Sequence, residues 1–527
     1  MKLKKVGVFW LLVGSILVSC SVRRGEEPIE VPRWTAQLFI DDYLIASQQN
    51  LRRRLNQPVK DFNGEKPLLA LEDEFGEFAS TLEANGTIVY DPRLEKYVMF
   101  ALGYSSQMRA QKPRRWESIR LYRFTSDDGM NWVKGDDGTP QWVFPRSPKD
   151  LYDPESGTSA TNVDLFSCYY DHEDPEYPYK AWQWFSNWLG DREGLYYLYS
   201  KDGMIWQRGP MVVNGYGHKE DPVYRKIEQD GRVLVGPGDV TRFYYDKIEN
   251  RFLGSFKFYS PEKVEYGNRI RCRAYAFFSH PVSEPFDITT IERIALLPAV
   301  AERNNDKPYD EYYGSTGYRY ESLWLGELKV WHSQGDYPWS TAGCAYLKLI
   351  VSRDGLNWKK VPFENADGYP EIYLPNGPEG GNNAQNDGGY VTVFSQGPLR
   401  IGDELIFYYG CSSYGKNHPN AVRMTGGGIF RARLRIDGFV SVEGGTLRTK
   451  QLSFDGKDLY LNAVGPVTVQ VLDKDGQAVG LEKIQGDSIR HKVLFDGKSL
   501  RDVVQGQTAS LRFSISDGGK LYSFTIR

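Results

Sequence analysis

The sequence is short of the residues and motifs that many functional classes require. It has only five cysteines, Cys20, Cys168, Cys272, Cys344 and Cys411, and no CxxC spacing, which excludes a disulfide framework. The six histidines lie far apart, and no HExxH, GxSxG or complete phosphate-loop motif, GxxxxGK followed by Ser or Thr, occurs. Zinc-protease, serine-hydrolase and phosphate-loop chemistries are therefore set aside. We expect the four later cysteines to be buried free thiols, with one incidental disulfide as the alternative.

Runs of a single charge and amphipathic helices are scarce as well. The formal net charge is only -3 and no basic block occurs, which argues against a nucleic-acid partner. Short aromatic and β-branched runs, broken by Gly, Asp, Asn and Pro, recur along the whole chain. This pattern predicts an all-β protein of about two domains.

The N-terminus has a lysine-rich opening and one apolar run, residues 6–18. That run is too short for a comfortable membrane span, so residues 1–20 are typical of a secretory signal. The run leads into L-V-S-C, which resembles a bacterial lipobox and implies cleavage before Cys20 and acylation of its thiol. Ser21 after the cysteine favours the outer membrane, and residues 21–37 are expected to form a polar tether. An ordinary signal peptide that ends in cysteine is the alternative.

One seven-residue pattern recurs along the chain. It reads S-D-D-G-M-N-W at residues 126–132, S-K-D-G-M-I-W at 200–206 and S-R-D-G-L-N-W at 352–358. The spacings of 74 and 152 residues place a degenerate copy at Ser279 and give a period typical of stacked supersecondary units. The Asp-Gly pair supplies a tight turn over which the Trp packs. We interpret the pattern as a structural Asp-box turn between the outer strands of a propeller blade.

Hairpins recur in phase with these turns. Asp91, Asp171 and Asp246 each open a polar turn between two predicted strands. Division of residues 38–440 by the period predicts a five-bladed β-propeller. Beyond it Trp is absent, and alternating strands broken by Asp-Gly turns predict a β-sandwich over residues 441–527, with a structural or a weak carbohydrate-binding role.

The start of each inner strand of a propeller faces the mouth where ligands bind. Upstream of each Asp-box, the candidate inner strands all begin near an acid or an amide: Glu83, Asn162 with Asp164, Asp239, Glu321 and Asp387. These residues are the candidates for the chemistry of the protein.

Several stretches resemble a group of secreted bacterial proteins. They are L-F-I-D-D-Y-L-I (38–45), N-Q-P-V-K (56–60), Y-E-S-L-W-L-G (320–326), F-Y-Y-G (407–410) followed by His418, and R-I-D-G-F-V-S-V (435–442). These proteins are glycosyl hydrolase family 32-like and family 43-like members of the five-bladed arabinanase, levansucrase and invertase superfamily. The resemblance covers nearly the whole chain, although the W-M-N-D-P-N-G, R-D-P and E-C motifs of family 32 are missing.

The resemblance implies glycoside hydrolysis by carboxylates at the propeller mouth. One carboxylic acid must protonate the leaving oxygen, and one carboxylate on the opposite face must attack or activate water. By resemblance, Glu83 is a base or nucleophile, Asp164 an orienting group and Asp239 an acid or a modulator of pKa. Glu321, between aromatics at the start of an apolar strand, is the best candidate general acid, and Asp387 is the reserve. A structural carboxylate is the alternative for each.

A sugar ligand would also need aromatic platforms and polar ligands. Trp184, Trp188 and Tyr320 are candidate platforms, with core packing as the alternative. Arg271 is a candidate ligand for an acidic or sulfated sugar, with an ion pair between blades as the alternative. His418 is a candidate substrate ligand, with a structural hydrogen bond as the alternative.

The sequence as a whole predicts a monomeric, lipid-anchored glycoside hydrolase of the cell envelope that acts on a poly- or oligosaccharide. The alternative is a surface lipoprotein that binds glycans without cleaving them. No metal or cofactor is expected in catalysis, and a structural calcium ion in the propeller channel stays an open alternative.

Overall fold

The computed structural model of the chain describes residues 27–71, 80–105, 108, 116–135, 138, 140–154, 157–186, 193–215, 225–260, 270–279, 283–299, 310–335, 342–365, 371–418 and 426–527. These residues are almost entirely β, which confirms the predicted class. The helices are single turns: η1 (Asp61–Gly64), η2 (Trp116–Ser118), η3 (Pro148–Leu151), η4 (Ile288–Thr290), α3 (Gly381–Ala384) and α4 (Leu500–Val504).

Five antiparallel sheets follow one another between residues 59 and 435, and we number them I to V. Sheet I contains β6 (Ser80–Asp91), β7 (Lys96–Ser105), β8 (Ile119–Ser126) and β9 (Gln141–Phe144). Sheet II contains β12 (Asn162–Tyr170), β13 (Tyr179–Ser186), β14 (Gly194–Ser200) and β15 (Trp206–Asn214). Between them lies a small pair, β10 (Tyr152–Asp153) and β11 (Thr158–Ser159).

The later sheets carry extra edge strands. Sheet III contains β16 (Arg225–Gln229), β17 (Arg232–Gly236), β18 (Arg242–Asp246), β19 (Arg251–Tyr259) and β20 (Arg271–Ser279). Sheet IV contains β21 (Asp310–Ser315), β22 (Tyr318–Tyr320), β23 (Leu323–Gly335), β24 (Ala342–Ser352), β25 (Lys359–Lys360) and β26 (Ile372–Leu374). Sheet V contains β27 (Val391–Val393), β28 (Leu399–Ile401), β29 (Glu404–Cys411), β30 (Gly428–Arg435) and the N-terminal β5 (Val59–Lys60).

Each of these sheets contacts the next one along the chain. Contacts join β6 to β12, β12 to β18, β20 to β21 and β24 to β27, and β27 returns to β6. Sheet V is completed by β5, which pairs with β30 through Lys60 and Ala432. Neighbouring sheets cover both faces of the central strands, so their sequences are near-continuous aromatic and aliphatic runs instead of alternating ones.

The Asp-boxes join the third and fourth strands of their sheets, as predicted. The Asp354 carboxylate accepts the backbone N–H groups of Leu356 at 2.9 Å and Asn357 at 2.7 Å, and Gly355 takes a left-handed φ of 77°. The indole of Trp358 then donates to the carbonyl of Gly355 at 2.7 Å. Ser279 ends β20, the equivalent strand of sheet III, but residues 280–282 of the degenerate copy lie outside the described residues.

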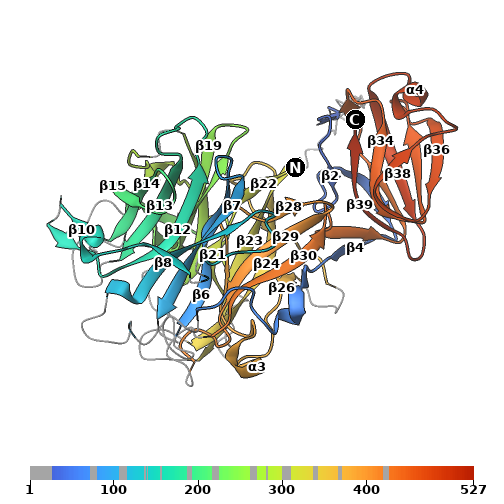
Figure 1. The fold of residues 1–527 in the computed structure, drawn as a ribbon. Helices are drawn as coiled ribbons and strands as arrows, with labels where there is room; N and C mark the ends of the chain where they lie inside the picture. The colour runs from blue at the N-terminus through green and yellow to red at the C-terminus, as the bar shows by residue number, and fades with distance from the viewer. Residues whose placement is uncertain are drawn as a thin grey trace, which may run out of the picture.

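The C-terminal region is a sandwich of two sheets, and the chain's N-terminal strands belong to it. One sheet contains β1 (Ile29–Val31), β3 (Ile45–Gln49), β32 (Thr446–Thr449), β33 (Leu452–Phe454), β35 (Val467–Leu472), β36 (Ala478–Ile484) and β38 (Thr508–Ile515). The other contains β2 (Gln37–Leu38), β4 (Arg52–Leu55), β31 (Val440–Glu443), β34 (Leu459–Val464), β37 (Asp487–Val493) and β39 (Lys520–Ile526). Figure 1 shows the blue β2 and β4 beside the red β39, to one side of sheets I to V.

The observed pairing corrects the predicted N-terminal boundary. The tether was predicted to end at residue 37 and the propeller to begin at residue 38, yet the strands between Ile29 and Leu55 pair with sandwich strands. The physical reason is burial: Phe39 is fully buried against Phe513 and Phe524 in the sandwich core. The sandwich therefore needs both ends of the chain.

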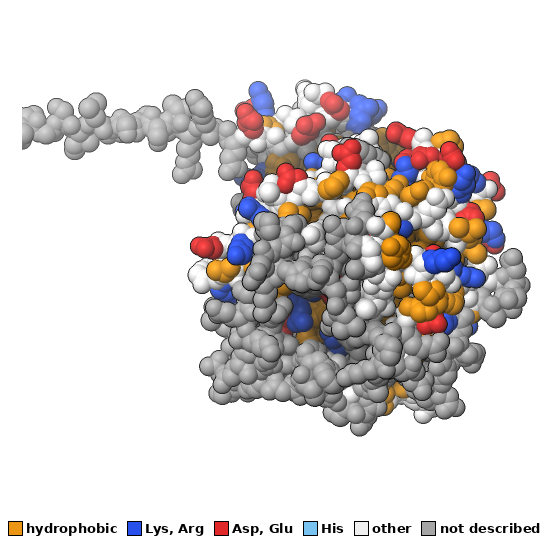
Figure 2. All heavy atoms as spheres, turned by 90° about the vertical axis from the view of Figure 1, so that its left-hand side faces the viewer, with side chains coloured by type: hydrophobic (Ala, Val, Ile, Leu, Met, Phe, Trp, Pro, Cys, Tyr) orange, Lys and Arg blue, Asp and Glu red, His pale blue; other side chains and the backbone are white. Residues whose placement is uncertain are grey.

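The surface carries mixed charge. On the described part of the face in Figure 2, Lys and Arg side chains are interspersed with Asp and Glu, with hydrophobic side chains between them. No helix of the described residues is long and apolar enough to cross a membrane.

The first Asp-box offers a matched pair of substitutions. Asp128 accepts the N–H groups of Met130 and Asn131, both at 2.8 Å, whereas the adjacent Asp127 makes an exposed ion pair with Lys96. We expect Asp128→Ala to lower the free energy of unfolding by about 1–2 kcal/mol and Asp127→Ala by less than about 0.5 kcal/mol.

Backbone hydrogen bonds lower the pKa of Asp128. Its contribution is therefore present above the ordinary pKa of 3.8 and lost on acidification below it. Urea unfolding of both variants at neutral and acidic pH measures the difference, and equal losses would contradict the structural role of the box.

Candidate active site

The inner strands of the sheets approach one another through small hydroxyl side chains. Thr87 of β6 bonds Ser395, which follows β27, at 2.6 Å and accepts the N–H of Cys168 in β12 at 2.9 Å. In the same way Ser167 of β12 accepts the N–H of Phe243 in β18 at 3.2 Å. Short side chains that hydrogen-bond across the gaps let these strands come close together. The starts of the inner strands are therefore gathered at one end of the sheets, opposite the Asp-boxes, and we call this the mouth end.

Glu83 and Asp164 are linked at the mouth end by a chain of hydrogen bonds. The amide of Asn85 donates to Glu83 Oε2 at 2.5 Å and lies 3.3 Å from the hydroxyl of Tyr104. Tyr104 in turn donates to Asp164 Oδ1. This chain of three contacts places the bonded oxygens of the two carboxylates at most roughly 8 Å apart. Glu83 is only 1% exposed and Asp164 is partly exposed, so the pair spans from the interior to an accessible surface.

Arg242 orients this group from sheet III. Its guanidinium donates to Asn85 Oδ1 and to the carbonyl of Val393, each at 2.5 Å. Asn85 is thereby fixed with its NH2 group toward Glu83. Burial lowers the pKa of Arg242 to about 10, against the opposing effect of Tyr104, Glu83 and Asp164.

Asp239 and Glu311 form a second pair of carboxylates, each matched to a cation. Lys257 makes an ion pair with Asp239, and Arg271 contacts Glu311 at 2.5 Å. Burial raises the pKa of Asp239, but Lys257, Arg271 and Lys416 outweigh it, so the pKa is lowered overall. The lowered pKa favours the ionised form of Asp239.

Lys329 of sheet IV lies against the rings of Tyr390 and Tyr313. Its ammonium is 3.1 Å from the centroid of the Tyr390 ring, and the residue is only 6% exposed. Burial lowers its pKa well below the usual value, while Glu83 and Asp164 act in the opposite direction. A buried amine beside two carboxylates makes the charge at the mouth end sensitive to what binds there.

Glu321 does not join these residues, which corrects its predicted place at the mouth. It occupies the turn between β22 and β23 with a left-handed φ of 49°, beside the start of an Asp-box. Its carboxylate accepts the N–H of Ala36 and the guanidinium of Arg400, both at 2.8 Å. It lies at the opposite end of sheet IV and holds the N-terminal segment.

Asp387 takes part in contacts that hold the fold together. It contacts Lys60 at 2.5 Å and accepts the hydroxyl of Tyr409 at 2.8 Å and the N–H of Gly377 at 3.1 Å. Because Lys60 belongs to β5, this buried ion pair attaches the N-terminal strand to sheet V.

The predicted sugar-binding residues are dispersed. Trp184 is fully buried and donates to Glu193 at 2.8 Å, so it belongs to the core. Tyr320 is buried and donates to Asp437 at 2.7 Å. His418 lies 4.0 Å from Glu379, and Arg271 is at the mouth end. Trp188 lies outside the described residues.

Several residues of the mouth end were not predicted from the sequence. One of them, Glu311, could have been found from its spacing to the Asp-box. Glu311 precedes its Asp-box at Ser352 by 41 residues, close to the 43 that separate Glu83 from Ser126, whereas Glu321 precedes it by only 31. The period therefore favours Glu311 as the acid of sheet IV. The others are Asn85, Tyr104, Arg242, Lys257, Lys329 and Lys416, which sit within strands or loops and carry no local motif.

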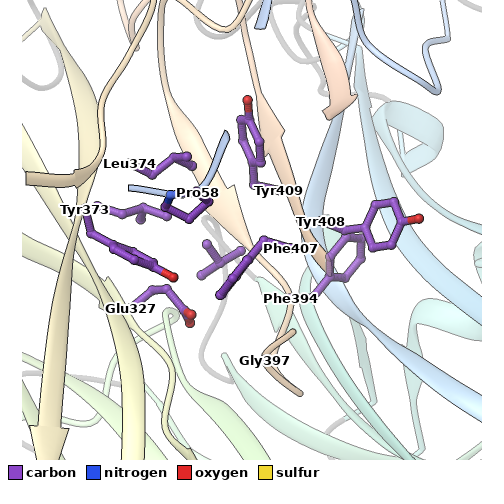
Figure 3. A pocket seen from close by; sticks show the side chains of 11 residues that line it. Pro58, Glu327, Tyr373, Leu374, Phe394, Gly397, Phe407, Tyr408 and Tyr409 are labelled. Carbon is purple, nitrogen blue, oxygen red and sulfur yellow. The ribbon is translucent and has the colours of Figure 1, made fainter. Parts of the chain in front are cut away.

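A further buried carboxyl, Glu327, lines a cavity between sheets IV and V. The cavity measures about 20 Å³, room for about one water molecule and too small for a sugar. Figure 3 shows the carboxyl of Glu327 and the hydroxyl of Tyr373 turned toward the same space. Tyr373 has no hydrogen-bond partner among the described residues, while Tyr318 donates to Glu327 at 2.9 Å. Burial raises the pKa of Glu327, but its enclosure separates it from any substrate.

None of the four later cysteines forms a disulfide, as predicted; Cys168, Cys272 and Cys411 are buried, whereas Cys344 is half-buried. No group of three or more His, Cys, Asp or Glu side chains in the described part of the chain is placed to hold a metal ion.

Comparisons with known proteins give distant likenesses. Neither a protein-family model nor a curated protein matches the sequence. Among solved structures, the chain is similar to a glycosyl hydrolase from Bacteroides ovatus, with 12% identity, a TM-score of 0.40, and coverage of 72% of this chain and 94% of the other. It is similar to a β-1,2-mannobiose phosphorylase from Listeria innocua, with 12% identity, a TM-score of 0.36, and coverage of 74% and 97%. An N-acetylgalactosamine deacetylase from F. plautii gives 13% identity, a TM-score of 0.37, and coverage of 73% and 96%. Such scores do not choose among hydrolysis, phosphorolysis and deacetylation.

Glu327 should make stability depend on pH in a distinctive direction. A carboxyl whose pKa is raised on folding favours the folded state at low pH and loses that contribution as pH rises from the unfolded pKa through the folded one. The stability of the wild type relative to Glu327→Gln should therefore fall as pH rises above about 4.5. Urea unfolding at several pH values measures it, with Glu173→Gln at an exposed site as the control. A constant difference between wild type and Glu327→Gln would contradict the prediction.

Proposed function

We propose that this protein is a glycoside hydrolase and that sheets I to V are the blades of a five-bladed β-propeller with Glu83 and Asp164 as its catalytic carboxylates. The observation that carries the proposal is the linkage of the two carboxylates through Asn85 and Tyr104 at the mouth end. Glycoside hydrolysis uses two carboxyl groups about 5–5.5 Å apart with retention or about 6.5–9.5 Å apart with inversion. An upper limit of roughly 8 Å is compatible with either outcome.

The surroundings of this pair suit the chemistry. The chemistry needs one protonated and one ionised carboxyl group, and a pair of carboxyl groups held close together in a poorly solvated site is the arrangement that enzymes use for this purpose. Tyr104 donates to Asp164 and Arg242 fixes Asn85, which limits both carboxylates to defined positions. Asp239, whose pKa is lowered, is held in an ion pair by Lys257 at the same end of the sheets.

Buried polar atoms at the mouth end support a hydroxyl-rich ligand. Thr81 Oγ1, both side-chain polar atoms of Asn162, and Glu311 Oε1 are buried without a hydrogen-bond partner among the described residues. Buried polar groups are normally satisfied, by water where not by protein. A sugar offers hydroxyl groups that act as both donors and acceptors, so it can satisfy groups of this kind.

The catalytic assignment predicts a clear ranking of variants. On a panel of neutral and acidic polysaccharides, Glu83→Gln and Asp164→Asn should each lower the release of reducing sugar about 10²- to 10⁴-fold. Glu321→Gln should stay within a few-fold of the wild type, since that residue lies at the opposite end of sheet IV. Thermal unfolding of each variant checks that the fold is kept.

The outcomes separate the alternatives. Activity lost only in Glu321→Gln would overturn the assignment of Glu83 and Asp164. Product that forms only when inorganic phosphate is present would replace hydrolysis by phosphorolysis. No product, together with retention of one glycan in an affinity gel, would favour the non-catalytic binding lipoprotein.

We also propose that the protein is an outer-membrane lipoprotein acylated at Cys20. The support is the sequence of residues 1–20, which lie outside the described residues. Metabolic labelling with an alkyne fatty acid should mark the wild type in a Gram-negative host and leave Cys20→Ala unmarked and in the soluble fraction. Equal labelling of both proteins would contradict acylation at this cysteine.

A further inference from the structure

Two aromatic rings share one cation on the outer face of the sandwich. The guanidinium of Arg527 lies 4.7 Å from the centroid of the Trp34 ring and 4.8 Å from that of the Tyr460 ring. Trp34 lies in the turn between β1 and β2, Tyr460 in β34, and Arg527 directly after β39. In this sheet β39 pairs with both β2 and β34, which lie beside it in Figure 1. We call the three residues the aromatic row.

The aromatic row faces away from the sandwich core. Leu459 and Leu461, on either side of Tyr460, are fully buried in that core, and successive side chains of a strand point to opposite faces. Tyr460 therefore points outward. Trp34 is 67% exposed, which is unusual for a side chain that is highly buried on average.

Trp34 is held in place although it is exposed. Its backbone has a left-handed φ of 65°, a conformation that bulky residues rarely adopt. Its N–H donates to the carbonyl of Ile526 at 3.2 Å, and Arg527 lies over its ring. Backbone strain of this kind is often found where a side chain is presented to a ligand. The indole is thus an open ring in a fixed position.

Polar groups and charges of both signs surround the aromatic row. At one end, Arg33 donates to the carbonyl of Asp455 at 2.8 Å, and the amide of Gln507 donates to the Asp455 carboxylate at 3.0 Å. At the other end, where β37 pairs with β34, Lys492 forms an ion pair with Asp458 at 3.0 Å. Donors and acceptors are therefore both at hand, and neither sign of charge is alone.

A neutral sugar chain matches this combination of groups. The C–H face of a sugar ring packs on an aromatic ring, and its hydroxyl groups exchange hydrogen bonds with polar side chains nearby. An apolar partner would cover the same polar side chains without offering them hydrogen bonds, which is costly.

We propose that the aromatic row is a second glycan-binding site, which holds a neutral polysaccharide on the sandwich. The site is separate from the mouth end, because Ala36, two residues after Trp34, donates to Glu321 at the opposite end of sheet IV. The inference goes beyond the proposed glycosidase function and does not depend on it. A protein that only binds glycans would use the same site.

The test measures retention of the full chain in native gels that contain arabinan, levan, mannan or polygalacturonate. Every protein carries Glu83→Gln, so that the polysaccharide is not digested in the gel. At least one of the three neutral polysaccharides should retard the parent protein. Trp34→Ala should raise the dissociation constant for that polysaccharide about tenfold, and Trp34→Phe, which keeps a ring, by less than about threefold.

The tyrosine of the aromatic row has a matched control. Tyr460→Ala and Tyr177→Ala each remove a ring whose centroid lies 4.8 Å from a cation, Arg527 and Lys201 respectively. Tyr177 lies between β12 and β13 of sheet II, so only Tyr460→Ala should weaken retention. Thermal unfolding of each variant shows whether the fold is kept.

Each outcome decides the inference. Equal retention of the parent protein and Trp34→Ala, no retention by a neutral polysaccharide, or retention by polygalacturonate alone would overturn it. Retention that is lost in Asp164→Asn and kept in Trp34→Ala would assign all binding to the mouth end and overturn it too. Binding to phospholipid vesicles that Trp34→Ala abolishes, with glycan retention unchanged, would make the aromatic row a membrane contact instead.

Failure of the catalytic assignment gives a different result. Glu83→Gln and Asp164→Asn would then leave sugar release unchanged, while Trp34→Ala still weakened retention. That result would keep the second site and reject the proposed catalytic pair.

Discussion

The packing of each Asp-box tryptophan against the preceding sheet is the contact on which the ring of sheets depends. Trp132 of sheet I meets Tyr408 of sheet V at 5.6 Å, Trp206 of sheet II meets Phe100 of sheet I at 5.5 Å, and Trp358 of sheet IV meets Tyr275 of sheet III at 4.7 Å. Such aromatic pairs each contribute about 0.5–1.5 kcal/mol beyond the area that they bury. At the same end, Asp91 accepts the hydroxyl of Tyr179 and Asp246 accepts the guanidinium of Arg319, each from the following sheet. One end of the ring is thus fixed by aromatic and ionic contacts, and the other end is left to carry polar groups.

The close approach of the inner strands explains the electrostatic environment at the mouth end. Inner strands that touch through Thr and Ser hydroxyls leave little room for water, so charges from different sheets face one another in a medium of low dielectric constant. Each carboxylate has a direct partner. Asn85 donates a hydrogen bond to Glu83, Tyr104 donates one to Asp164, and Lys257 forms an ion pair with Asp239. The partner lies in the same strand for Glu83, in the same sheet for Asp239 and in the neighbouring sheet for Asp164.

Sequence analysis located the elements that recur at the repeat period. It failed for the residues whose spacing departs from that period. The Asp-boxes, the turn aspartates and the acids Glu83, Asp164 and Asp239 are all found where the spacing placed them, because local turn chemistry and strand length set their positions. Glu321 was placed at the mouth and Glu311 was missed, since the first strand of sheet IV is split into β21 and β22 and the aromatic residues around Glu321 lie at the other end of the sheet. The N-terminal strands were misplaced for another reason, and the ion pair of Asp387 with Lys60 was not predicted. Their partners, Lys60 for Asp387 and residues 440–526 for the strands, are hundreds of residues away, and no local pattern reports a distant partner.

The pairing of the first strands with the last ones has a consequence for how the protein is made. β5 completes sheet V only after β30 exists, and β1 to β4 find their sandwich partners only among the final strands. Residues 29–60 must therefore wait, unpaired, until nearly the whole chain has been synthesised. Contacts of such long sequence separation slow folding, since the entropy of closing the loop is lost before the contacts repay it. The sandwich is therefore incomplete until both ends of the chain are present, with β39 as the last strand to be added.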